Sequence, residues 1–489
     1  MMFNSKSLTI LKLQKQIDRI IQVLEPREFV NCHMVSYFCD DLWNKFIPEN
    51  IRNEINCKED VDTAIEVFLH QDNAKTELLH KHRNLYNYIN FMKSFYLENL
   101  EDKFFHTTDE LLEKFHHLNI PFSSGLNLSI REFMKEKKNH EVEIISRIIA
   151  ALVKARDRNH FIVDVGDGKG YLSSRLNLEF KLKVLGIDGN QQNTKEAEKR
   201  NQKLSKKWKA LVSKEALKNN IENVIVDTEM SNERYKTASS MIFAQTNLNE
   251  LVNEKFPEEA TNNICLVGLH TCGNLAASSL KQFVKNDSIK LLCNVGCCYH
   301  LIFEEFEDDF FDDEVRVMDK RDEPAFPMSN YLQMKQYKLG RNARMLGSQS
   351  LDRVIAKKEL PDESLFYRAL FEKLVKEKWF VGERKSIKLG KIRHKNFEDY
   401  LKKGCKKFNI ELNMTSEEIE KLAEDHEYDR RLINLNYFIR LLLSKIVETL
   451  ILLDRYLYLL ESDTDKVFLV KIFDPVISPR NHAIIAIKK

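Results

Sequence analysis

A glycine-rich segment that directly follows a short apolar run is the feature that most constrains the fold of this chain. The run His160-Phe-Ile-Val-Asp164 is typical of a buried strand, and a helical pattern begins at Tyr171. The glycines between them allow a close approach of the backbone to a ligand, and a helix start offers N–H groups to an anion. A tight turn without a ligand would use the same glycines. The binding interpretation assigns the ligand to Asp164, Gly166, Asp167, Gly168, Lys169 and Gly170.

An acidic residue at the end of the next apolar run supplies the second half of a nucleoside site. Asp188, followed by Gly189, lies where a carboxylate accepts hydrogen bonds from ribose hydroxyls. A dinucleotide site would need a small residue at position 171, which is Tyr171 here. The Asp-x-Gly-x-Gly-x-Gly form instead resembles motif I of methyltransferases. This resemblance implies S-adenosylmethionine as the cofactor, with Gly168 and Gly170 under its methionine moiety and Asp188 on its ribose. Gly189 is assigned to the same cofactor site.

Strand and helix patterns alternate after residue 140, which indicates an α/β core. Apolar runs at 182–187, 263–268 and 289–295 are separated by helical material, as in a parallel sheet covered by helices. One more strand is expected before residue 262, with 223–227 as the best candidate. The end of the chain predicts a helix and two strands, at 446–460, 466–473 and 482–488.

These patterns predict a Rossmann-like, seven-stranded methyltransferase core with a C-terminal antiparallel hairpin. A chain of 489 residues is too long for a single core, so further units are expected. We assign the core to 140–303 and 440–489, a helical N-terminal domain to 1–139, and a mainly helical insertion to 304–439.

Two predicted strands end in residues that can do chemistry. One runs into Gly268-Leu-His270-Thr-Cys272 and the other into Gly296-Cys297-Cys298-Tyr299-His300. Because ligands of open α/β sheets gather at the carboxyl ends of strands, both segments should converge on one pocket. His270 and His300 are candidate general bases, Tyr299 is a candidate for orienting the acceptor, and Cys297 is a further catalytic candidate.

The cysteines of these two segments have alternative interpretations. Their spacing matches none of the usual zinc arrangements, and adjacent cysteines rarely both bind one tetrahedral ion, so no metal is expected. Buried cysteines often act as small apolar residues, and simple packing beneath the cofactor loop is an equally strong interpretation.

Several separated motifs resemble the methyltransferase-like protein 25 family, including its ribosomal RNA adenine dimethylase domain-containing relatives. They are His270-Thr-Cys-Gly273, Cys297-Cys-Tyr-His300, Phe326-Pro-Met-Ser329, Phe366-Tyr-Arg368, Glu448-Thr-Leu-Ile-Leu-Leu-Asp454 and Phe473-Asp-Pro475. The resemblance implies a methyltransferase that uses S-adenosylmethionine. A wider group with similar motifs includes transfer RNA ribose methyltransferases, which makes RNA a candidate acceptor. The segment ending at His270 lacks the Asn/Asp-Pro-Pro-Tyr motif that grips a flipped adenine, so adenine dimethylation is not expected.

Two charged segments favour different macromolecular partners. Residues Lys373 to Phe408 carry thirteen Lys/Arg against four Asp/Glu, interleaved with aromatic residues, which suits RNA. A solvated helical face would look the same. The run Glu304 to Glu314 holds eight acids and suits a basic protein. The substrate therefore stays open between RNA and protein, and the oligomeric state is undetermined.

The remaining features concern the compartment and the kind of function. The N-terminus lacks the apolar stretch of a secretory signal, and nine cysteines fit a reducing compartment. Charged residues within Leu441 to Leu460 argue against a membrane span. We expect an intracellular protein, cytoplasmic or nuclear, that acts as a methyltransferase. The alternative is a catalytically silent methyltransferase fold that serves as an interaction or assembly module.

Overall fold

The chain forms two compact units. The computed structural model describes residues 5–116, 134–156, 160–218, 231–257, 262–306, 323–379 and 389–489. Unit 1 comprises Met1–Ile21, Leu97–Ser348 and Val447–Lys489, and unit 2 comprises Gln22–Tyr96 and Gln349–Ile446. This division differs from the four consecutive segments expected from the sequence. Early helices and the insertion share one core in unit 2, where Phe68 stacks on Phe438 with ring centroids 5.0 Å apart.

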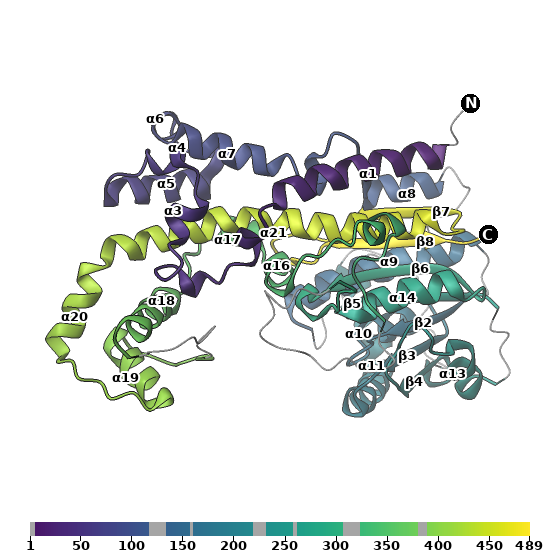
Figure 1. Cartoon of the computed structure of the whole chain (residues 1–489). Coiled ribbons are helices and arrows are strands. Elements are labelled where there is room, and N and C mark those ends of the chain that lie inside the picture. The colour runs from purple at the N-terminus through teal and green to yellow at the C-terminus, as the bar shows by residue number, and fades with distance from the viewer. Residues whose placement is uncertain are drawn as a thin grey trace. The chain divides into compact units, whose positions relative to one another are not determined.

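Unit 1 is built on one sheet of eight strands (Figure 1). The strands are β1 (Phe105–Thr107), β2 (Phe161–Val165), β3 (Val184–Asp188), β4 (Tyr235–Ser239), β5 (Ile264–Cys272), β6 (Ile289–Cys297), β7 (Lys466–Lys471) and β8 (His482–Ile487). Their order is β1-β7-β8-β6-β5-β2-β3-β4. Strand β8 runs antiparallel to both β6 and β7, and the other neighbours are parallel. The Rossmann-like core with its antiparallel hairpin is confirmed.

Two strands differ from the sequence prediction. The expected helical N-terminal domain contributes β1, which extends the seven expected strands by pairing with the edge strand β7. Three residues leave too short a pattern to detect, and the strand exists because β7 offers an open edge. The candidate 223–227 lies outside the described residues. A strand is found instead at β4, whose sequence Tyr-Lys-Thr-Ala-Ser is too polar to read as an apolar run.

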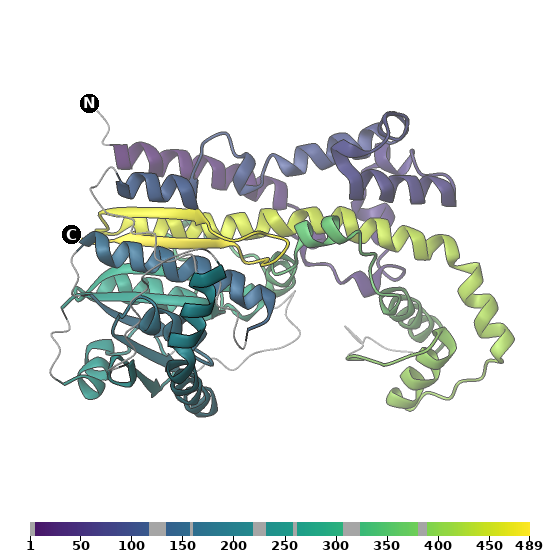
Figure 2. The same ribbon diagram turned by 180° about the vertical axis from the view of Figure 1, so that it is seen from behind.

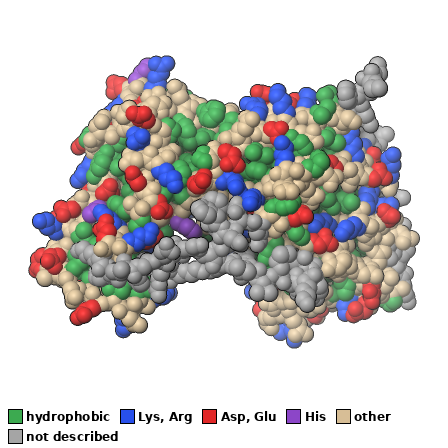
Figure 3. Space-filling model, in the orientation of Figure 1, with side chains coloured by type: hydrophobic (Ala, Val, Ile, Leu, Met, Phe, Trp, Pro, Cys, Tyr) green, Lys and Arg blue, Asp and Glu red, His purple; other side chains and the backbone are tan. Residues whose placement is uncertain are grey.

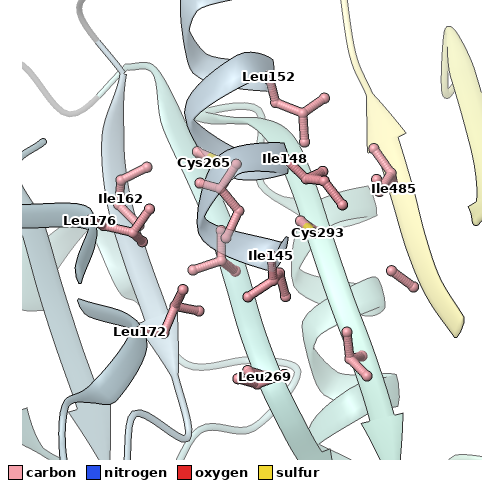
Figure 4. Close-up of a cluster of buried hydrophobic side chains, with 14 of the residues drawn as sticks. Ile145, Ile148, Leu152, Ile162, Leu172, Leu176, Cys265, Leu269, Cys293 and Ile485 are labelled. Atoms are coloured by element: carbon pink, nitrogen blue, oxygen red, sulfur yellow. The ribbon is translucent and has the colours of Figure 1, made fainter. Parts of the chain in front are cut away.

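Helices cover both faces of the sheet in unit 1. They are α1 (Ser5–Leu24), which continues past the unit boundary, α8 (Thr108–His116), α9 (Glu136–Arg156), α10 (Tyr171–Leu178), α11 (Gln191–Lys218), α12 (Ser231–Arg234), α13 (Leu248–Lys255), α14 (Asn274–Lys285), α15 (Asn330–Met334), α16 (Arg341–Gly347) and the second half of α21 (Glu427–Glu461). Figure 4 shows Ile145, Ile148 and Leu152 of α9 above the buried side chains of four strands. Alternate strand residues point to the opposite face, where α14 packs on β5 and β6.

The described residues of unit 2 form helices joined by loops, with no strand among them (Figures 1 and 2). Its helices are α2 (Arg27–Asn31), α3 (Leu42–Phe46), α4 (Glu49–Arg52), α5 (Lys58–His70), α6 (Thr76–Lys81), α7 (Arg83–Lys93), α17 (Leu351–Lys357), α18 (Ser364–Leu374), α19 (Phe397–Phe408), α20 (Ser416–Asp425) and the first half of α21. In the described part of the chain, no helix is long and apolar enough to span a membrane.

Candidate functional site

The glycine-rich loop between β2 and α10 forms an open backbone cradle. Gly166, Gly168 and Gly170 have φ angles of 76°, 59° and 67°, a left-handed conformation that favours glycine. A Cβ at Gly170 would lie 2.8 Å from the Cβ of Ala197 and 2.6 Å from the hydroxyl of Tyr235, so packing requires glycine there. A Cβ at Gly168 would meet only the Gly166 carbonyl oxygen, at 3.9 Å. The space beside Gly168 can therefore receive a ligand.

Asp188, at the end of β3, lies beside this cradle as the sequence predicted. Its Oδ2 accepts a hydrogen bond from the Gly168 N–H at 3.0 Å. Its Oδ1 accepts from the Asn190 N–H at 2.8 Å and from Nδ2 of Asn193 at 3.1 Å. A carboxylate has about four lone-pair sites, so one remains for a further donor such as a ribose hydroxyl. The loop and Asp188 thus form one site.

The two other acidic residues of the loop are turned into the core. Asp164 is buried, and its Oδ2 accepts a hydrogen bond from the hydroxyl of Ser173 at 2.9 Å. Burial, together with the nearby Asp167, raises the pKa of Asp164 well above its ordinary value. Tyr235 donates a hydrogen bond to Asp167 at 2.5 Å, and Gly186 leaves the room for that carboxylate. Both side chains therefore support the loop from beneath.

The other two residues predicted for the cofactor lie at the rim of the loop. Lys169 is exposed and pairs with Glu196 at 2.8 Å. Gly189 is exposed, and a Cβ there would lie 2.3 Å from the sulfur of Met241. Met241 is 60% exposed beside Asp188, although large apolar side chains are usually buried. The sequence reasoning missed Met241, because nothing in the sequence connects it with Gly189.

His270 is held by a carboxylate that the sequence reasoning did not assign to the site. Its Nε2 lies 2.9 Å from Oε2 of Glu141 in α9, and its side chain is 23% exposed. Glu141 is fully buried and also accepts a hydrogen bond from the Ser478 hydroxyl at 2.7 Å. Burial by itself raises the pKa of Glu141. The hydrogen bond and charge of His270, the charge of Lys138 and the hydrogen bond from Ser478 outweigh burial and lower the pKa to about 2.

Tyr299 is buried within a polar network and does not face a substrate. It is 1% exposed, and its hydroxyl donates to Glu448 at 3.1 Å. Arg480 also contacts Glu448, at 2.8 Å, and its guanidinium carbon lies 5.4 Å from the Tyr299 ring centre. This network joins the motif that begins at Glu448 to the loop between β7 and β8. His300 follows Tyr299 in the same short turn and is half-buried.

The predicted catalytic candidate Cys297 lies within a cluster of three thiols at the ends of β5 and β6. Its sulfur is 3.1 Å from that of Cys272 and 3.7 Å from that of Cys298. The hydrogen bond from Cys297 lowers the pKa of Cys272, and the same contact raises the pKa of Cys297. The cysteines therefore contact one another, which is compatible with the packing interpretation.

Two aromatic residues of the basic segment are buried. Phe397 and Tyr400 of α19 are buried, so neither can stack on an unpaired base. Lys402 and Lys403 are exposed but pair with Glu398 and Asp399. On the face in Figure 3, Lys and Arg side chains are interspersed with Asp and Glu. Of the acidic run, the residues from 307 to 314 lie outside the described part, and Glu304 is buried in an ion pair with Arg344.

Comparisons with known proteins agree with this fold. Residues 137–305 match a family described as a methyltransferase domain, so the chain carries a methyltransferase domain. It is 32% identical to probable methyltransferase-like protein 25 of Homo sapiens, over 75% of this chain and 76% of that protein. It is also 32% identical to probable methyltransferase-like protein 25 of Mus musculus, over 74% and 76%. The chain belongs to the methyltransferase-like protein 25 family.

Proposed function

We propose that this protein transfers a methyl group from S-adenosylmethionine to a macromolecular acceptor, either RNA or protein. The observation that carries the proposal is the open cradle at Gly168 joined by a hydrogen bond to Asp188. A cofactor with an amino acid moiety and a ribose suits a site in which the start of a helix offers backbone N–H groups and a carboxylate lies beside the loop.

The chain's own residues would hold the cofactor and exclude alternatives. The start of α10 would receive the methionine carboxylate, Asp188 would accept a hydrogen bond from the ribose, and the exposed Met241 would lie against the adenine base. S-adenosylmethionine supplies an electrophilic methyl group on a positively charged sulfur. Tyr171 occupies the position where a dinucleotide loop needs a small residue.

His270 is the best-placed general base in this site. Glu141 lies 3.1 Å from the Lys138 ammonium and accepts a hydrogen bond from Ser478, so it is ionised at neutral pH and His270 Nε2 carries the proton of their shared hydrogen bond. In the neutral ring Nδ1 is then an acceptor, as in base–carboxylate pairs that orient an imidazole. It can take the proton that an N–H or O–H acceptor group loses on methylation. Glu141 acts as a positioning residue.

The partial exposure of His270 supports a large acceptor. A macromolecule has to bring its reacting group to the enzyme surface, and the His270 side chain and Cys272 both reach solvent at the ends of the strands. On the face drawn in Figure 3, basic and acidic side chains are mixed and favour neither RNA nor a basic protein. Both acceptor classes therefore remain within the proposal.

Calorimetric titration tests the cofactor first. The full chain is titrated with S-adenosylmethionine and with NAD, alongside Asp188→Ala and the control Asp287→Ala, whose side chain is fully exposed. Loss of a charged hydrogen bond of about 1.5–3 kcal/mol weakens binding about 10- to 150-fold. We expect that loss for Asp188→Ala only, and no NAD binding. Absence of binding to either ligand would refute the enzyme and favour the catalytically silent assembly module.

A further inference from the structure

We propose that Cys272, Cys297 and Cys298 form a zinc site at the carboxyl ends of β5 and β6, with its fourth position open. The three sulfur atoms lie within 4.8 Å of one another. All three cysteines are free thiols. The proposal rests on this cluster alone and does not depend on methyl transfer.

The sulfur separations fit one tetrahedral ion. A Zn–S bond of about 2.3 Å places two sulfur ligands about 3.8 Å apart. The observed separations are 3.7 Å for Cys297 and Cys298 and 3.1 Å for Cys272 and Cys297. Side-chain rotations that move the sulfurs by less than about 1 Å would complete three corners of the tetrahedron. On binding, each thiol gives its proton to solvent.

Backbone geometry explains how adjacent cysteines can share an ion. Side chains of successive strand residues normally point to opposite faces of a sheet. Cys298 has a φ of 53°, in the left-handed region, directly after the last residue of β6. The chain turns there, so the sulfurs of Cys297 and Cys298 lie on the same side. Cys272 joins them because it pairs with Cys297 across the two strands.

Buried positive charge beside the cluster favours an anionic site. Three thiolates and one Zn²⁺ carry a net charge of about −1. Arg455 is 1% exposed, and its Nε and Nη2 have no hydrogen-bond partner among the described residues. The Arg455 side chain reaches the end of β6 only because residue 296 is glycine. A Cβ at Gly296 would lie 2.4 Å from Nη1 of Arg455. Asp454, Tyr299 and Cys297 act electrostatically on this buried guanidinium, and an anionic metal centre at Cys297 would add to that compensation.

The open position gives the site its chemical character. Cys272 is exposed, whereas Cys297 is buried and Cys298 is half-buried, so the cluster reaches solvent on one side. Three protein ligands with a fourth position open to water or substrate are typical of catalytic zinc sites, and structural sites are closed by four. The site would therefore hold a Zn²⁺ that can bind a further small ligand.

Metal titration of the reduced full chain tests this site. Co²⁺ serves as the spectroscopic probe, and Zn²⁺ content is measured by mass spectrometry after dialysis. We expect one Zn²⁺ per chain and, with Co²⁺, the intense absorption of sulfur ligation. Cys272→Ser and Cys298→Ser should each weaken metal binding by more than about tenfold, because losing even an outer-shell partner costs 10- to 100-fold. Cys57→Ser, an exposed cysteine outside the cluster, is the matched control.

Three results would overturn the proposal. The first is a reduced, folded chain that binds neither ion. The second is binding that survives both cluster substitutions, and the third is binding that Cys57→Ser abolishes equally. Circular dichroism of each variant separates a lost ligand from a lost fold.

Discussion

Replacing two glycines of the same loop should separate folding from cofactor binding. Gly168 and Gly170 both have left-handed backbone angles, so alanine at either position costs about 1–2 kcal/mol of backbone strain. Only Gly170 also lacks room. Its Cβ would lie 2.8 Å from the Cβ of Ala197 and 3.2 Å from its Cα, which a helix holds in place. Such overpacking adds about 1–3 kcal/mol.

We therefore expect different outcomes for the two variants. Gly170→Ala should lower the free energy of unfolding by about 2–5 kcal/mol, and Gly168→Ala by about 1–2 kcal/mol. In Gly168→Ala the new methyl group points into the open cradle and should weaken S-adenosylmethionine binding at least about tenfold. In Gly170→Ala it points toward Ala197 and Tyr235, so the folded protein should keep most of its affinity.

Urea unfolding followed by circular dichroism measures the first quantity, and calorimetric titration at a temperature where both variants are folded measures the second. Gly404→Ala in unit 2 controls for the generic effect of a crowded glycine, because its Cβ would meet the Phe371 ring at 2.7 Å, far from the loop in sequence. The reasoning is refuted if Gly168→Ala binds normally while Gly170→Ala loses the ligand.

Three further predictions concern the buried polar groups. The pKa of Glu141 is lowered from 4.5 to about 2, so its stabilising effect is present above pH 4.5 and is lost as the pH falls toward 2. The urea midpoint of unfolding, measured between pH 5 and pH 2, should therefore fall less steeply with pH for Glu141→Gln than for the native chain. Parallel curves for the two proteins would contradict this. The pKa of Asp164 is raised, so the stability of the folded chain falls as the pH rises above 3.8. In thermal unfolding, Asp164→Asn should therefore be more stable than the native chain at pH 8 but not at pH 3. Tyr299→Phe should lower the unfolding free energy by about 1 kcal/mol without changing S-adenosylmethionine affinity; a change in affinity measured by calorimetry would place Tyr299 in the binding site.

Local patterns in the sequence were sufficient for the core of unit 1. Six strands begin within two residues of the start of the apolar run that predicted them, namely β2, β3, β5, β6, β7 and β8. Such strands are buried on both faces, so their residues are almost continuously apolar and easy to recognise. The loop glycines and Asp188 could be recognised because each follows directly on, or ends, one of these easily recognised strands.

Contacts between distant segments could not be predicted in the same way. Glu141 bonds to His270, 129 positions away, and no local pattern connects the two. Strand β1 depends on the edge of β7, and the second unit depends on helices from two segments, Gln22–Tyr96 and Gln349–Ile446, that lie far apart in the sequence. Each of these arises from the packing of segments whose pairing is decided only when the whole core forms.

The sequence by itself determined the class of fold, the methyltransferase character and the place of the glycine-rich loop, because each depends on residue types at short, regular spacing. Only the tertiary structure decided which polar side chains face the site. It buried Tyr299, turned Asp164 and Asp167 inward, and gathered three thiols whose spacing along the chain argued against a metal. The physical reason is that side-chain direction depends on backbone angles such as that of Cys298 and on the surrounding helices, which residue order alone does not specify.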